Sequence, residues 1–263
     1  MTLLPLIVML LAAAQAPSPV SPAFEVASIK PSALRDTRMR IIWPRGRFSS
    51  ANATMRQFVG AAYVLPAFRI EGGPGWFDTD RFNIEATVAA DTVMAQPRGM
   101  PEAIRLMMQT LLADRLMFAA HWEKKPQTIY MLVRTKPGGA SGPNLQKSNA
   151  DCAALFAGRR PGDPLPPVAL CGNQRTPGRW TAGSLPMTQL ADTLESMLQQ
   201  VVVDRTELAG AFNVDLTWAA DPATAPGPSL FTAIQEQLGL KLEATKAPVD
   251  VLVVDRLERP SAD

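Results

Sequence analysis

The chain has 263 residues, of which 47% are hydrophobic and 19% charged, so it can bury the core of one large domain or of two small ones. Its 26 Lys and Arg residues against 24 Asp and Glu give a net charge of +2, which argues against the basic excess of a dedicated nucleic-acid binder. One His and two Cys exclude metal sites that need several imidazoles or thiolates, and we expect neither a metal nor a cofactor.

The N-terminus predicts export. Residues 1–14 have the form of a signal segment, because they hold an uncharged apolar block that is too short to span a bilayer. We expect cleavage after Ala14; the alternative, after Ala16, would leave Pro17 as the first mature residue. The start of this segment lacks the Lys or Arg that a signal segment usually carries. A retained anchor and a frayed apolar N-terminus are therefore the alternatives. No later stretch reaches spanning length, so we expect a periplasmic or extracellular protein, with a tether and an N-terminal strand over 15–45.

Three stretches recur in the same order, which indicates a duplication. The matching pairs are 46–58 and 178–190 at an offset of 132, 82–88 and 212–218 at 130, and 126–134 and 248–256 at 122. The falling offset implies small loop deletions in the second copy. We therefore predict copy one at 46–134 and copy two at 178–256, followed by a tail at 257–263.

Each copy predicts the same elements in order: an amphipathic helix, two strands, a second helix and two closing strands. In copy one these are 55–63, 68–70, 82–88, 104–112, 116–122 and 128–134. In copy two they are 187–198, 201–203, 212–218, 231–238, 240–243 and 249–256. The order predicts an α+β fold of two tandem modules, each a small, mostly antiparallel sheet with helices on one face.

Capping signals mark the ends of the predicted helices. Thr54 and Gln57 have the form of a capping box, and Pro186 suits a first helical turn. Ser229 is expected to cap the second helix of copy two, and Gly239 to end it. The strand at 82–88 alternates, which predicts that its polar residues face solvent; these are Asn83, Glu85 and Thr87.

Between the copies, residues 135–177 are rich in Gly and Pro and hold both cysteines. We expect a linker or excursion here and no third domain. Cys152 and Cys171 have no His or further Cys nearby, so in an oxidising compartment they predict a disulfide that closes a loop of about 20 residues, worth roughly 3 kcal/mol in the chain-entropy model. Two free thiols are the alternative.

Several segments resemble a bacterial secreted family classed only as a domain of unknown function. The segments that carry the resemblance are 24–32, 72–76 with 80–82, 112–115, 203–210 and 237–248, and it covers 23–260. Related domains occur attached to membrane metallopeptidases of the antibiotic-sensor type. The resemblance implies relatives and brings no catalytic residues with it.

The order of elements also resembles the short N-terminal domain of secretins and TonB-dependent receptors. Copy two carries this resemblance best, at 190–194, 201–204 and 238–240. Such modules mediate periplasmic protein contacts and signalling. The resemblance is one of architecture, and it implies protein contact without fixing the function.

His121 is the only imidazole, so any Ser-His-Asp or Cys-His mechanism must use it. No G-x-S-x-G motif is present, and neither cysteine has the context of a nucleophile. We favour the alternative, a surface or cross-strand histidine near the end of a strand.

Asp78, Asp80 and Asp114 are candidates for paired acid–base carboxylates or for a hard cation. The segment 78–80 lacks the Gly and the distant Glu of a calcium loop, and Asp-Arg pairs recur along the chain. We therefore favour carboxylates that orient arginines. Four methionines at helical spacing with apolar residues predict core packing in preference to a soft-metal site; they are Met100, Met107, Met108 and Met117.

A glycine-rich loop is the best candidate for a contact site, because copy two has nothing like it. It is not a phosphate loop, since no Lys-Ser/Thr follows and a strand comes next. The alternative is a structural loop whose aromatic residue folds back over the helices. Its residues are Gly72, Gly73, Pro74, Gly75 and Trp76.

Together these patterns predict a noncatalytic binding or sensing module. The expected partner is an envelope or extracellular protein, contacted through an exposed sheet edge or the 72–76 loop. The alternative is a secreted hydrolase that uses His121 or the Asp78 and Asp80 carboxylates in a cleft between the modules.

Overall fold

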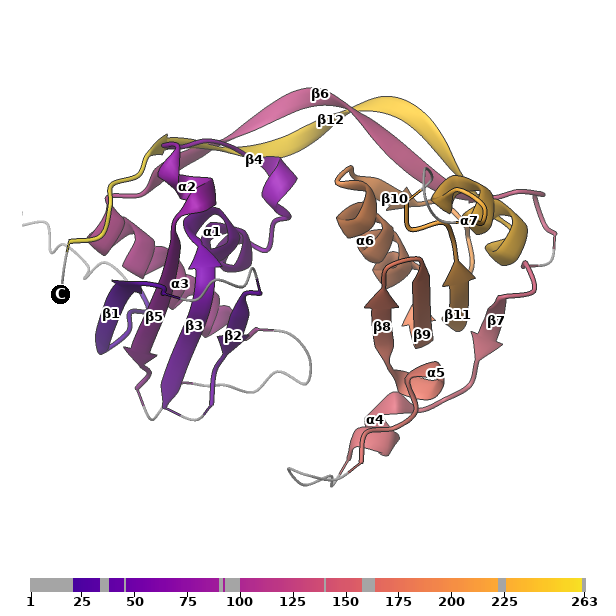
Figure 1. Ribbon diagram of the computed structural model, residues 1–263, viewed down its shortest axis with the longest axis horizontal. Helices are drawn as coiled ribbons and strands as arrows, with labels where there is room; N and C mark the ends of the chain where they lie inside the picture. Colours follow the sequence, from indigo (N-terminus) through magenta and orange to yellow (C-terminus); the bar gives the residue numbers. More distant parts are fainter. Residues whose placement is uncertain are drawn as a thin grey trace, which may run out of the picture. The chain divides into compact units, whose positions relative to one another are not determined.

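The computed structural model describes residues 21–33, 38–44, 46–89, 92, 100–139, 141–157, 164–221 and 226–261 (Figure 1). The predicted signal segment and its cleavage sites lie outside the described residues. The chain divides into two compact units. Unit 1 comprises Met1–Leu65, Gly73–Ala119 and Val254–Asp263, and unit 2 comprises Pro66–Gly72 and Ala120–Val253. No described helix is both long and apolar enough to cross a membrane.

Unit 1 is built on an antiparallel sheet in the order β1-β5-β3-β2 (Figure 1). Its elements are β1 (Val26–Pro31), β2 (Arg40–Ile42), β3 (Arg47–Thr54), α1 (Met55–Tyr63), α2 (Trp76–Thr79), β5 (Arg81–Thr87) and α3 (Glu102–Leu116). The predicted capping box is confirmed, because the Thr54 hydroxyl accepts the N–H of Gln57 at 3.2 Å and the Gln57 side chain accepts the N–H of Thr54 at 3.0 Å. The largest buried side chains come from the sheet, α1, α2 and α3: Phe48, Met55, Phe58, Phe77, Ile84, Ile104, Met108, Leu112 and Leu116.

Unit 2 contains a second antiparallel sheet in the equivalent order β7-β11-β9-β8. Its elements are β7 (Leu145–Ser148), α4 (Cys152–Phe156), α5 (Val168–Cys171), β8 (Asn173–Thr176), β9 (Arg179–Pro186), α6 (Met187–Leu198), β11 (Ala211–Thr217) and α7 (Leu230–Leu238). The predicted ends of α7 are confirmed: Ser229 caps its first turn and Gly239 ends it at a φ of 68°. The core centres on Trp180, Leu190, Leu194, Leu216, Ile234 and Leu238. The predicted excursion at 135–177 therefore also supplies both edge strands of this sheet.

A third sheet joins the two copies in the order β10-β6-β12-β4. Its strands are β4 (Ile70–Gly72), which follows the short helix η1 (Ala67–Arg69), β6 (Ala119–Arg134), β10 (Val202–Asp204) and β12 (Leu240–Arg256). β10 of copy two runs parallel to β6 of copy one, and β4 of copy one bonds to β12 of copy two. We call this pairing the strand exchange, because each short strand pairs with the closing strand of the other copy.

The α+β class is confirmed, and the first two sheets show matching pairs at the predicted offsets. In unit 1, Phe48 pairs with Ala86 across the sheet, and the residues 132 and 130 positions later, Trp180 and Leu216, pair in unit 2. The helix ends correspond as well: Met117 and Gly239, 122 positions apart, both have a positive φ. The two sheets therefore share their strand order and these pairings, and the duplication itself stays a prediction.

The closing strands differ from the prediction. Each copy was expected to end in two strands, but β6 and β12 are single strands of 16 and 17 residues. Pro126 lies inside β6, in a polar stretch typical of a turn. β10 covers β6 only at Tyr130–Leu132, so no described strand pairs with this flank of β6 at Pro126, and a residue without an N–H is tolerated there.

Candidate functional site

The predicted contact loop leads directly into α2, and its glycines serve the packing of an aromatic ring. Gly72 and Gly73 have φ values of 73° and 89°, a backbone region that favours glycine. A Cβ on Gly73 would lie 2.7 Å from Cδ1 of Phe77, so this glycine makes room for the ring. Phe77 is buried, and the guanidinium carbon of Arg56 lies 4.6 Å from its ring centroid. The ring beneath the loop is thus held on two sides.

Trp76 packs against its own unit. Its ring meets Phe82 edge-on at a centroid distance of 5.9 Å, and the guanidinium carbon of Arg259 lies 5.1 Å from its centroid. Arg259 also donates to Oδ2 of Asp80 at 2.6 Å. These contacts leave Trp76 half-buried and tie the C-terminal tail to α2. They give the loop a structural role, and a contact with a partner there stays a prediction.

Two of the three candidate carboxylates, Asp78 and Asp80, are paired with arginines. Asp78 accepts a hydrogen bond from Nη2 of Arg56 at 3.0 Å and a second from its Nε, and Asp80 pairs with Arg259. Asp114 is exposed and lines a hollow of about 300 Å³ beside residues 23–27. Among the described residues, no group of three or more His, Cys, Asp or Glu side chains is placed to hold a metal ion.

The remaining candidate residues are His121 and the methionines. His121 is an exposed residue of β6. Met107 and Met108 are buried in α3, whereas Met117 is exposed and ends that helix in the left-handed conformation. The structure therefore uses two of the predicted methionines as core.

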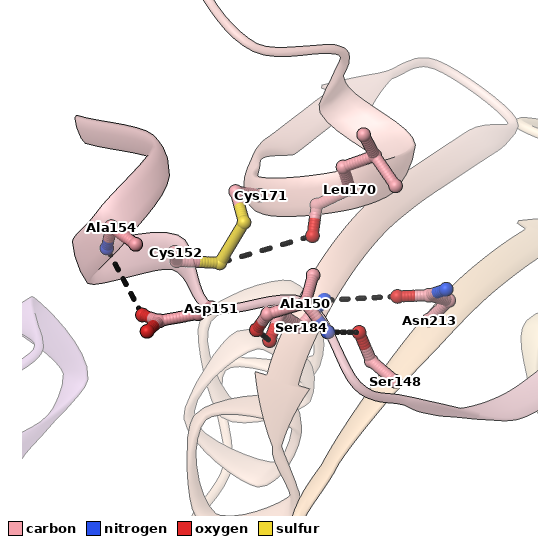
Figure 2. The surroundings of a disulfide bond; sticks show 9 residues. All are labelled: Ser148, Ala150, Asp151, Cys152, Ala154, Leu170, Cys171, Ser184 and Asn213. Atoms are coloured by element: carbon pink, nitrogen blue, oxygen red, sulfur yellow. Dashed lines mark hydrogen bonds between the residues drawn. A yellow bond between two sulfur atoms is a disulfide. The ribbon is translucent and has the colours of Figure 1, made fainter.

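Cys152 and Cys171 form the predicted disulfide, which joins α4 to α5 beside β9 (Figure 2). Asp151 caps α4 by accepting the N–H of Ala154 at 3.0 Å. The hydroxyl of Ser184 in β9 donates to the carbonyl of Ala150 at 3.2 Å, which holds the chain leading into α4 against the sheet. The disulfide thus connects two short helices that are anchored on unit 2.

Gly183 explains how α5 sits on the sheet. A Cβ at this position of β9 would lie 2.4 Å from the carbonyl carbon of Leu170 and 2.5 Å from that of Ala169. The backbones of α5 and β9 therefore touch, and the N–H of Gly183 donates to the carbonyl of Gly172 at 2.9 Å. In copy one the equivalent position is Ala51, opposite Arg40 of β2, so the close approach belongs to copy two alone.

The two helices present an apolar surface to solvent. Residues 152–157 and 164–171 contain no charged side chain and no free hydroxyl, amide or thiol. Four large side chains here are 41% to 78% exposed, namely Leu155, Phe156, Leu165 and Leu170. We name these four residues the α4–α5 surface. Exposed apolar side chains gathered in this way mark interaction sites.

The edge strand β8 begins two residues after α5, and all four of its residues are exposed. An open hollow of about 540 Å³ lies at its end, lined by Arg175, Thr176, Pro177, Met197 and Trp218. Sequence reasoning missed both features. A sequence signal for the α4–α5 surface was present, because the segments next to the two cysteines, 153–157 and 164–170, contain only apolar residues.

One titrating carboxylate lies at the strand exchange. Burial raises the pKa of Glu195, while the N–H of Val202 and the charge of Arg69 act in the opposite direction. Glu195 accepts that N–H at 3.3 Å, which ties α6 to β10. Arg69 in turn donates two hydrogen bonds to the carbonyl of Asp250, at 3.0 and 2.8 Å.

Comparison with known proteins gives one match. The model of a family described as "Protein of unknown function (DUF3738)" matches residues 56–257. No curated protein and no solved structure matches the chain.

Proposed function

Since the chain belongs to the DUF3738 family, whose description names no activity, we propose from its surface that it is an exported, noncatalytic module that binds another protein at the cell envelope. The observation that carries the proposal is the α4–α5 surface. It is apolar, exposed and covalently closed by a disulfide.

The apolar side chains of the α4–α5 surface gain free energy when a partner removes them from water. Burying one large apolar side chain is worth about 1.5–3 kcal/mol, so four exposed ones represent several kcal/mol available to a partner. The disulfide and the contact with Gly183 fix the helices before binding, which lowers the entropy lost on association. A fixed apolar surface is therefore suited to protein contact.

Two further observations support the proposal. Asp78 and Asp80 are each paired with an arginine, so both carboxylates already have structural partners. A disulfide is compatible with the oxidising compartments that exported proteins enter.

A photoreactive amino acid at position 165 tests the proposal in the envelope of the producing cell. We expect a covalent adduct with one protein, lost when Leu155 and Phe156 are both replaced by Ser. The matched control carries the same amino acid at position 64, since Val64 is also an exposed apolar residue but lies in unit 1.

Three results would contradict the proposal: no protein adduct at 165, adducts alike at 64 and 165, or an adduct with lipid alone. A Trp76→Ala variant tests the loop separately. If the adduct at 165 persists in that variant, the 72–76 loop takes no part in binding this partner.

A further inference from the structure

Within the part of the chain that the structure describes, the β8 strand has a free edge. It is the outer strand of its sheet and pairs with β9 from Asn173 opposite Ala182 to Thr176 opposite Arg179. In an antiparallel pair, every second residue of an edge strand points its N–H and C=O away from the sheet. Those groups are the standard attachment point for an extended segment of another protein.

The hollow at the end of β8 adds a chemical preference. Met197 and Trp218 give it apolar walls, and Arg175 brings a guanidinium to it. Among the described residues, no carboxylate pairs with Arg175; its side chain has one hydrogen bond, from Nη1 to the hydroxyl of Ser196 at 3.4 Å. A guanidinium without a carboxylate, beside apolar walls, suits an acidic and an apolar side chain on the same face of an added strand.

We infer that the partner adds an extended segment to the β8 edge and places an acidic side chain against Arg175. The inference rests on the proposed function, because β8 follows the α4–α5 surface directly and one partner can cover both. An apolar residue two positions from that acidic residue lies on the same face of the added strand and enters the hollow beside Met197 and Trp218. Recognition thus combines backbone pairing along β8 with one charged contact.

A second copy of this chain is a poor occupant of the same edge. The four residues of β8 are Asn, Gln, Arg and Thr, so two paired β8 strands would bring two Arg175 side chains to one ladder with no carboxylate between them. Like charges on neighbouring strands are destabilising. The charge of the edge therefore favours an acidic segment of a different protein.

The test uses the full chain with a photoreactive amino acid at position 174 and, in a separate preparation, at position 165. We expect both positions to label the same protein, and the peptide attached at 174 to contain Asp or Glu. Arg175→Gln should reduce both adducts about tenfold, the loss expected for one charge-assisted hydrogen bond. Arg40→Gln, on the edge strand β2 of the other sheet, is the matched control and should leave both adducts unchanged.

The outcomes separate the two proposals. An adduct at 165 without one at 174 overturns the β8 inference and leaves the proposed function standing. So does an adduct at 174 whose peptide lacks an acidic residue, or one that Arg175→Gln does not weaken. If neither position labels a protein, both proposals fail.

Discussion

Asn83 and Asn213 hold the same position in the two copies and make the same bond. Asn83 accepts the N–H of Asn52 at 2.9 Å, and Asn213 accepts the N–H of Ser184 at 3.0 Å. Both donors have a positive φ, at a point where the register of the sheet shifts. Each asparagine therefore satisfies a backbone N–H that leaves the regular ladder.

Replacing Asn83 by Ala should destabilise unit 1 by about 1–3 kcal/mol, because the N–H of Asn52 would be left without its acceptor. Urea denaturation measures the change. Thr87→Ala, at an exposed position of the same strand, is the control and should cost much less. An equal loss in both variants would mean that the bond contributes nothing specific.

Gly183→Ala should displace α5 from β9. Its Cβ would meet backbone atoms, which cannot rotate away, so we expect a loss of about 1–3 kcal/mol and a weaker adduct at position 165. Gly75→Ala provides the comparison, since nothing lies within 4 Å of a Cβ at that position. A stable Gly183→Ala protein with unchanged labelling would refute the assigned role.

Glu195→Gln should alter how stability depends on pH. Because burial raises the folded pKa above the ordinary 4.5, the folded chain keeps a proton that the unfolded chain releases. Protonation of Glu195 thus favours the folded state of the wild type at low pH. This contribution to the free energy of unfolding is lost as the pH rises from 4.5 through the folded pKa. The stability of the variant relative to wild type should therefore increase across that interval.

Urea midpoints measured from about pH 4 to 8 check the expectation for Glu195. Glu236→Gln, on the exposed side of α7, controls for the loss of one helical charge. A difference between the Glu195 variant and wild type that stays constant with pH would contradict it.

A chain opened between Gly139 and Ser141 should yield two fragments that purify together. The first fragment would carry β4 and β6, and the second β10 and β12, so the strand exchange links them. Leu132→Glu should weaken the association, because Leu132 is fully buried in β6 opposite Asp204. Size-exclusion chromatography of the co-expressed fragments is the measurement, and separate elution of two folded fragments would rule the linkage out.

Local patterns were enough to predict the module. The repeat is visible because core positions such as Phe48 and Trp180 keep their spacing, and caps such as Thr54 with Gln57 act over three residues. The disulfide was predictable because only one pair was available. The strands before the first helices, β3 and β9, were missed, since their short alternation is interrupted where the register shifts.

Partner choice within the third sheet could not be predicted. The stretch around Pro126 is polar and typical of a turn, and nothing local shows that it continues as one strand. The pairing of Val202 with Tyr130 joins residues 72 positions apart in different copies. Such contacts depend on the whole chain.

The α4–α5 surface could not be predicted either, because the exposure of its side chains depends on tertiary structure. Leu165 and Leu170 look like core residues, and only their tertiary placement exposes them. For Trp76 the sequence left open a contact loop or an aromatic residue folded back on the protein, and the ring packs against Phe82 and Arg259. The direction of a side chain from a loop depends on residues far away in sequence.

The strand exchange also sets an order of assembly. β4 (Ile70–Gly72) comes early in this sequence, but its partner β12 (Leu240–Arg256) is the last of the described strands to be synthesised. A ribosome that stops before residue 240 releases a product in which β4 has no neighbour and one side of β6 is bare. The third sheet can therefore be completed only after β12 has been synthesised. We expect truncated products to be degraded, because they expose unpaired strand edges.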